Sequence, residues 1–281
     1  MTPTAPPPEP ATLAHDAVPP HHRVHYVSVD GKQQATVRLP LAFSTPVRPD
    51  LIQRAVVAAQ THRRQPYGTS PTGGARHSVQ WSGKGKGVAR TPRLMDSMRG
   101  AQSPNTVGGR AAHPPKVERI WAKKINRKER RLAFASALAA TRETHLAEAR
   151  GHDVPHGLAL PVIVDDPLEE IRTAGAAREF LEKLKLWADV ERSRDGVHLR
   201  ASGRARRRGR VRRTPRSVLV VTSAAGRARG FTNLSGVDVV PVLRLSTEDL
   251  APGGVPGRLT LFSRAAVESL RTRLGEEEVV G

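Results

Sequence analysis

One stretch, residues 62–116, constrains this chain most, because it cannot contribute much to an apolar core. Its 55 residues include nine glycines and six prolines, few apolar residues and no helical or strand periodicity. Irregular segments of this length are uncommon inside compact domains and are usually functional or disordered. Ordering a backbone costs about 1–2 kcal/mol per residue. We therefore predict an extended loop that is ordered only by an external partner.

Positive charge is concentrated in two parts of the chain. Residues 60–131 contain 17 Lys and Arg against three acids, and residues 202–216 contain eight Arg and no acid. These blocks carry 14 and 8 net positive charges, more than the +20 of the whole chain, so the remainder is close to neutral. Clustered cations of this kind are typical of nucleic-acid binding. The absence of cysteine excludes disulfides and thiolate chemistry.

The rest of the sequence alternates between strand-like and helix-like segments. Buried-strand patterns occupy 160–166, 217–223, 237–245 and 257–263, and helical spacing occupies 48–65, 117–149, 178–187 and 264–274, with Ser263 as a cap and a short helix at 226–234. Two further strand-like runs flank Asp30-Gly31, a hairpin signal. The pattern predicts an α/β fold with a mostly parallel sheet flanked by helices and a long extended basic loop projecting from the globular body.

The predicted organisation has four parts. Residues 1–22 form a disordered Pro-rich tail, 23–275 a single α/β globular domain, 62–116 a loop inserted within it, and 202–216 an Arg-rich RNA-contacting segment.

The motif "WSGKGKG" at 81–87 suggests how the loop contacts a nucleic acid. Glycines let a backbone approach phosphates closely, cations attract phosphates, and Trp81 offers a flat face for a base or sugar. The candidate RNA-binding residues are Arg63, Arg64, Arg76, Trp81, Lys84, Lys86, Arg90, Arg93, Arg99, Arg110, Lys116, Lys123, Lys124, Arg127, Lys128, Arg130, Arg131, Arg204, Arg206, Arg207, Arg208, Arg210, Arg212 and Arg213.

Other motifs point less clearly to chemistry. "GKGKG" lacks the spacing and the Ser or Thr of a P-loop, so nucleotide binding there is rejected. Asp165 and Asp166 follow a strand, and this position favours a structural role in a strand-end turn. The alternative is that the two carboxylates act in acid–base chemistry or bind Mg²⁺. His21, His22 and His25 leave metal binding open, although no metal or cofactor is expected.

Six segments resemble one family in that family's order. They are "RPDLIQRAVVAAQTHRRQPYGT", "WSGKGKGVARTPR", "GGRAAHPPKVERIWAKKINRKERRLA", "LPVIVDD", "LWADVERS" and "LAPGGVPGRLTLFSRAAVESL". The chain resembles the universal large-subunit ribosomal protein "L-four" family in its archaeal form, from about residue 23 to residue 274.

The resemblance implies a structural ribosomal constituent that is not an enzyme. Its loop would thread into large-subunit rRNA, with a tip at 73–93 that helps line the peptide exit tunnel. The implied partners are large-subunit rRNA, neighbouring ribosomal proteins and the nascent peptide, with no membrane and no homo-oligomer, on cytoplasmic ribosomes. The alternative is an RNA-processing or RNA-modifying enzyme with a basic substrate-guiding loop, for which Asp165 and Asp166 are the candidate catalytic residues.

Overall fold

The computed structural model describes residues 23–28 and 33–275 and divides them into two units. The first unit comprises the chain up to Val57 and from Ile125 onward, and the second is Ala58–Lys124. The predicted tail 1–22, with His21 and His22, and the Asp30-Gly31 turn lie outside the described residues.

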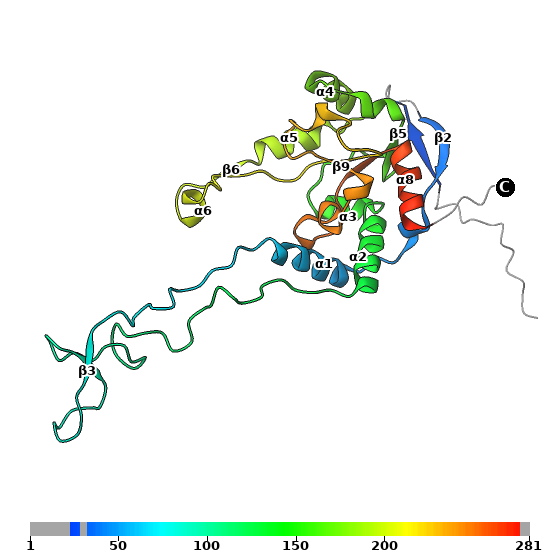
Figure 1. The fold of residues 1–281 in the computed structure, drawn as a ribbon. Helices are drawn as coiled ribbons and strands as arrows, with labels where there is room; N and C mark the ends of the chain where they lie inside the picture. Colours follow the sequence, from blue (N-terminus) through cyan, green and yellow to red (C-terminus); the bar gives the residue numbers. More distant parts are fainter. Residues whose placement is uncertain (1–22, 29–32, 276–281) are drawn as a thin grey trace, which may run out of the picture. The chain divides into compact units, whose positions relative to one another are not determined.

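A six-stranded sheet in the order β2-β1-β5-β10-β8-β9 forms the centre of the first unit (Figure 1). Its strands are β1 (Arg23–Val27), β2 (Gln33–Arg38), β5 (Val162–Val164), β8 (Leu219–Thr222), β9 (Asp238–Pro241) and β10 (Thr260–Ser263). Strand β2 pairs antiparallel with β1, and every other neighbouring pair is parallel. The mostly parallel α/β sheet expected from the sequence is therefore confirmed.

Alternation along the buried strands divides the core between the two faces of the sheet. In β5, Ile163 contacts one apolar cluster while its neighbours Val162 and Val164 contact the other; Phe262 and Leu261 in β10 divide in the same way. Successive side chains of a strand point to opposite faces, so a run that is apolar throughout needs cover on both sides.

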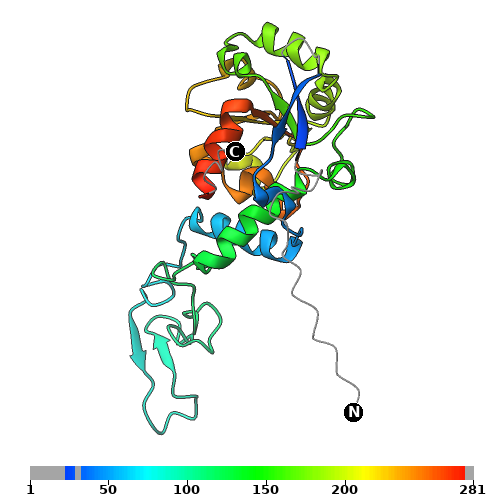
Figure 2. The ribbon, with the colours of Figure 1, turned by 90° about the vertical axis from the view of Figure 1, so that its right-hand side faces the viewer.

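Helices supply that cover. On one face lie η2 (Leu41–Ser44), α1 (Pro49–His62), α2 (Arg127–Ala140), η5 (Val242–Arg244), α7 (Thr247–Leu250) and α8 (Arg264–Leu274). The short turn η6 (Pro252–Gly254) follows α7. On the other lie α3 (Thr144–Ala149), η3 (Asp166–Glu170), α4 (Ala174–Lys183), α5 (Trp187–Asp195) and η4 (Arg229–Phe231). Helices α1 and α2 also pack together through Leu51, Ala55 and Ala133, as the crossing blue and green helices of Figure 2 show.

Helix α8 begins as predicted, because the Ser263 side chain accepts a hydrogen bond from the Ala266 amide at 3.1 Å. No helix among residues 23–28 and 33–275 is long and apolar enough to cross a bilayer.

Three predicted elements have different boundaries in the structure. The expected helix 117–149 is wrong over 117–126, which has no helix, and it divides into α2 and α3 after Ala140. Ile120 is 86% exposed, so a helix there would have no apolar surface to cover. The strand predicted over 237–245 ends at Pro241, which has no amide to continue the ladder, and the helix predicted at 226–234 is the single 3-10 turn η4.

The helix predicted at 178–187 also divides in two. Lys185 adopts a left-handed φ of 58°, and this reversal separates α4 from α5 while burying both Leu184 and Leu186. Core packing therefore outweighs the helical propensity of the sequence here.

A buried polar network holds α5 against β8. Asp189 is fully buried and accepts hydrogen bonds from Ser217 Oγ at 2.6 Å and Arg192 Nε at 2.9 Å, and His152 Nδ1 lies 3.1 Å from each carboxylate oxygen. Burial raises the pKa of Asp189, but His152, Ser217 and Arg192 outweigh burial and lower the pKa from 3.8 to about 2. This network, which serves the fold, was not predicted from the sequence.

Candidate nucleic-acid interface

The second unit, Ala58–Lys124, contains a short hairpin where no regular structure was expected. Strands β3 (Val79–Trp81) and β4 (Pro92–Leu94) pair antiparallel, with Trp81 opposite Pro92. The hairpin directs an exposed connection that carries Lys84, Lys86 and Arg90. Absence of an apolar core does not prevent this pairing, because backbone hydrogen bonds and polar side chains hold it.

Glycines shape that connection through their conformation. Gly83, Gly85 and Gly87 have φ values of 69°, 81° and 66°, and no atom lies within 4 Å of a Cβ built at any of them. Positive φ, and not lack of space, is therefore what requires glycine at these positions. The result is an exposed backbone with two lysines between three glycines, open to a bulky anionic partner.

Trp81 is 67% exposed at the end of β3. An exposed indole on a paired strand loses little further freedom when it stacks, which suits it to contact with a base or a ribose. The position therefore agrees with the chemistry expected of Trp81 from the sequence.

Local acceptors engage Arg93 and Arg76 in this unit. Arg93 donates to the Met98 carbonyl at 2.9 Å and to the Ala89 carbonyl at 3.2 Å, and it is half-buried. Arg76 donates to Thr72 Oγ1 at 2.8 Å. Arg93 therefore closes the hairpin in the structure, whereas the other 23 predicted residues are exposed.

An aromatic stack joins the two chain segments at the ends of the unit, residues 61–69 and 115–124. We call these segments its limbs and the region where they meet its base. The rings of Tyr67 and Trp121 stack with centroids 5.3 Å apart, and the guanidinium carbons of Arg64 and Arg119 lie 4.3 and 4.6 Å from the Trp121 ring centroid. Sequence reasoning included Arg64 but missed Tyr67, Arg119 and the role of Trp121. The available signal was a tyrosine near the start of the glycine- and proline-rich stretch 62–116 and a tryptophan just after its end.

Backbone contacts reinforce the same base. The Thr69 amide donates to the Pro115 carbonyl at 3.1 Å, and the Lys123 amide donates to Thr61 Oγ1 at 3.1 Å. A Cβ on Gly68 would lie 2.7 Å from the Val117 nitrogen, so the limbs approach closely only because residue 68 is glycine. Lys123 and Lys124, expected on a helix, instead lie on this return limb.

In the first unit, cations gather at the start of α2. Arg127, Lys128, Arg130 and Arg131 are all exposed there, whereas Glu129 pairs with Arg54 at 3.0 Å. Cations near a helix N-terminus oppose the helix dipole by about 0.3–1 kcal/mol each. A polyanionic partner would offset this unfavourable placement.

The Arg-rich segment forms a second hairpin, with β6 (His198–Leu199) antiparallel to β7 (Arg212–Arg213). Between them lies the single turn α6 (Arg204–Arg207), and Figure 1 shows β6 leading from α5 to α6. The seven predicted arginines of this hairpin are exposed, namely Arg204, Arg206, Arg207, Arg208, Arg210, Arg212 and Arg213. Arg216 is different, because it pairs with Asp238 at 2.6 Å.

Asp166, in the Asp pair after β5, has a structural contact. Asp166 Oδ1 accepts a hydrogen bond from the Ala265 amide at 2.8 Å, so this carboxylate stabilises the first turn of α8. The described residues contain no group of three or more His, Asp or Glu side chains arranged to hold a metal.

Comparison with known proteins decides the family. The model of the ribosomal protein L4/L1 family matches residues 37–273. This chain belongs to that family. Over 258 residues it is 47% identical to the large ribosomal subunit protein uL4 of Methanopyrus kandleri, covering 89% of this chain and 98% of the relative.

Further uL4 proteins are similar over almost the same length. The uL4 of Pyrobaculum aerophilum is 46% identical, covering 90% of each chain. That of Haloquadratum walsbyi is 43% identical, covering 88% of this chain and 98% of the relative. The archaeal form of the L4 family expected from the sequence is therefore confirmed, and the enzyme alternative has no support.

Proposed function

We propose that this chain is a structural constituent of the large ribosomal subunit, where it binds and stabilises large-subunit rRNA without catalysing a reaction. The observation that carries the proposal is exposed positive charge with few acids to neutralise it. Residues 58–124 contain thirteen Lys and Arg against two acids, Asp96 and Glu118. Membership of the L4 family supports the proposal, as do the ribosomal names of its archaeal relatives.

The loop 62–116 acts as an extension that enters folded rRNA. Its tip at 73–93 lies beside the peptide exit tunnel and meets the nascent peptide there. The open, glycine-shaped connection and the exposed face of Trp81 support this role, because they suit contact with phosphates and bases. The start of α2 and the hairpin at 202–216 bind rRNA from the globular domain.

The protein works on cytoplasmic ribosomes beside neighbouring large-subunit proteins, as a single copy that contacts no membrane. With about ten phosphate contacts, the slope of log affinity against log salt is of order −7 to −9. An affinity that does not respond to salt would contradict the proposal.

Ultraviolet crosslinking in native cell extract tests the proposal directly. The RNA joined to the protein is sequenced, and the crosslinked peptides are mapped. We expect large-subunit rRNA joined through peptides in 62–116 and 202–216. A mixture of tRNA and mRNA joined near Asp165 and Asp166 would instead support an RNA-processing enzyme.

A further inference from the structure

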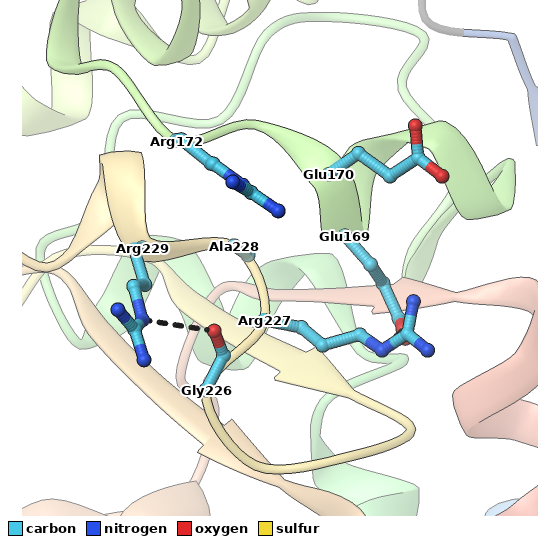
Figure 3. A pocket seen from close by; sticks show the side chains of 7 residues that line it. All are labelled: Glu169, Glu170, Arg172, Gly226, Arg227, Ala228 and Arg229. Carbon is cyan, nitrogen blue, oxygen red and sulfur yellow. Dashed lines mark hydrogen bonds and ion pairs between the residues drawn. The ribbon is translucent and has the colours of Figure 1, made fainter.

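A polar hollow lies in the first unit, apart from the proposed rRNA-binding elements. It has a volume of about 750 Å³ (Figure 3). Its lining comes from η3 and the chain just after it, from the loop that joins β8 to η4, and from the first residue of η4. Among these are three arginines from two distant parts of the sequence, Arg172, Arg227 and Arg229. Guanidinium groups that line one hollow are suited to bind phosphate or carboxylate oxygens.

The loop that carries two of these arginines is fixed in place. The Ala228 amide donates to the Glu169 carbonyl at 2.8 Å, and the Gly230 amide donates to the Ile171 carbonyl at 3.0 Å. Ala228 itself is buried with a left-handed φ of 51°, a conformation that a residue with a Cβ adopts only when its surroundings impose it. Arg227 and Arg229 therefore extend from a rigid frame.

The Glu169 carboxylate, which is buried at the hollow, already has hydrogen-bond and ion-pair partners. Glu169 accepts hydrogen bonds from the Ser223 amide at 2.6 Å and from the hydroxyls of Ser223 and Ser263 at 2.8 and 2.5 Å, and it pairs with Arg227 at 3.3 Å. The Glu169 carboxylate and the Arg227 guanidinium therefore hold the ends of β8 and β10 together.

Two guanidinium groups remain available to a ligand. Arg229 uses its Nε to donate to the Gly226 carbonyl at 3.1 Å, which leaves its terminal amino groups for another acceptor. Arg172 has no carboxylate partner among the described residues, and it is exposed at the hollow. Figure 3 shows Arg172 beside Glu169, with the Glu170 carboxylate on the side away from Arg229.

We propose that this hollow binds a phosphodiester group of rRNA through Arg172 and Arg229, while Arg227 and Glu169 hold the frame. This inference rests on the proposed function and adds a fourth contact to the loop, the start of α2 and the Arg-rich hairpin. Ala228 supplies the only apolar side chain of the lining, and no aromatic ring is present among the described residues there. A peptide would find no apolar anchor and a base no aromatic ring, whereas a phosphate needs only the guanidinium groups.

Modification of arginines by phenylglyoxal tests the site. The full chain is treated alone, with large-subunit rRNA alone, and in intact large subunits, and adducts are counted by mass spectrometry. We expect rRNA alone to lower modification of Arg172 and Arg229 by an order of magnitude. Modification of Arg90, in the loop 62–116, is measured as an independent test of the proposed function.

The outcomes separate the two proposals. If Arg90 is protected while Arg172 and Arg229 stay reactive in both complexes, the phosphate site is wrong and the proposed function stands. Protection of the pair only in intact subunits would identify a protein partner, such as an acidic peptide, and would overturn the site. If rRNA protects none of the three, both proposals fail.

Variants matched in charge provide a second test. One double variant carries Arg172→Gln and Arg229→Gln. The control double variant carries Arg194→Gln and Arg244→Gln, which removes two exposed cations that do not line the hollow. Loss of one phosphate contact is expected to make the salt slope shallower by about 0.7–0.9 relative to the control pair. Equal slopes for two variants that melt at the parental temperature would refute the site.

Discussion

The stack around Trp121 makes a quantitative prediction for the chain without RNA. The change Trp121→Ala removes the Tyr67 ring contact, worth about 0.5–1.5 kcal/mol, and two guanidinium contacts of about 0.5–1 kcal/mol each. The free energy needed to open the base of the unit should fall by about 1.5–3.5 kcal/mol. Since about 1.4 kcal/mol is a factor of ten, opening becomes about 10- to 400-fold more frequent.

Hydrogen exchange of two amides measures this opening. The amides of Thr69 and Lys123 donate across the base, to Pro115 and Thr61, and should exchange faster by the same factor. Trp81→Ala is the matched control, because it removes the same side chain from the same unit at a position that is 67% exposed. It should leave both amides unchanged.

Two results would refute the reasoning. If Trp121→Ala leaves the exchange of Thr69 and Lys123 unchanged, the stack does not hold the limbs together. If both amides exchange at unprotected rates in the parent chain, the base is open without RNA, as the sequence alone predicted for the whole segment.

Three further predictions concern charge and stability. Replacing all three arginines of 206–208 by Gln should make the salt slope of rRNA binding shallower by about 2–3, measured by filter binding across a salt series; an unchanged slope would remove this hairpin from the interface. Because the folded pKa of Asp189 lies below its unfolded value of 3.8, its contribution of about 2 kcal/mol is complete above about pH 4 and is lost as the pH falls towards 2. Denaturant unfolding across this range should show that loss in the parent and not in Asp189→Asn. Gly257→Ala should lower the free energy of unfolding by more than about 2 kcal/mol, since its Cβ would lie 2.5 Å from the Leu146 carbonyl oxygen at a φ of 91°. Gly175→Ala, in a helix with open space around it, should raise that energy by about 0.5–1 kcal/mol, so a loss of stability in this control would contradict the argument.

Prediction from the sequence succeeded where a local pattern coincides with burial. The apolar runs around Ile163, Val220 and Phe262 predict strands covered on both faces, and the structure places all three in the parallel part of the sheet. It failed at 117–126, where helical spacing alone was insufficient because nothing covers Ile120.

The candidate interface shows the same division. Exposure of 23 of the 24 predicted residues agrees with the charge pattern, since Lys and Arg side chains are rarely fully buried. The local acceptors of Arg93 were not predictable, because Met98 and Ala89 are brought to it by the hairpin and its turns. The Trp121 stack depends equally on two limbs meeting across more than fifty residues of sequence.

The sequence by itself determined the class of fold, the location of positive charge and the family, because these follow from periodicity, composition and the order of motifs. The tertiary structure decided which cations are engaged internally, where helices stop, and how Arg172 comes to lie beside Arg227 and Arg229. The physical reason is that pairing and burial depend on contacts between distant residues, and only the packed sheet and its loops bring those residues together.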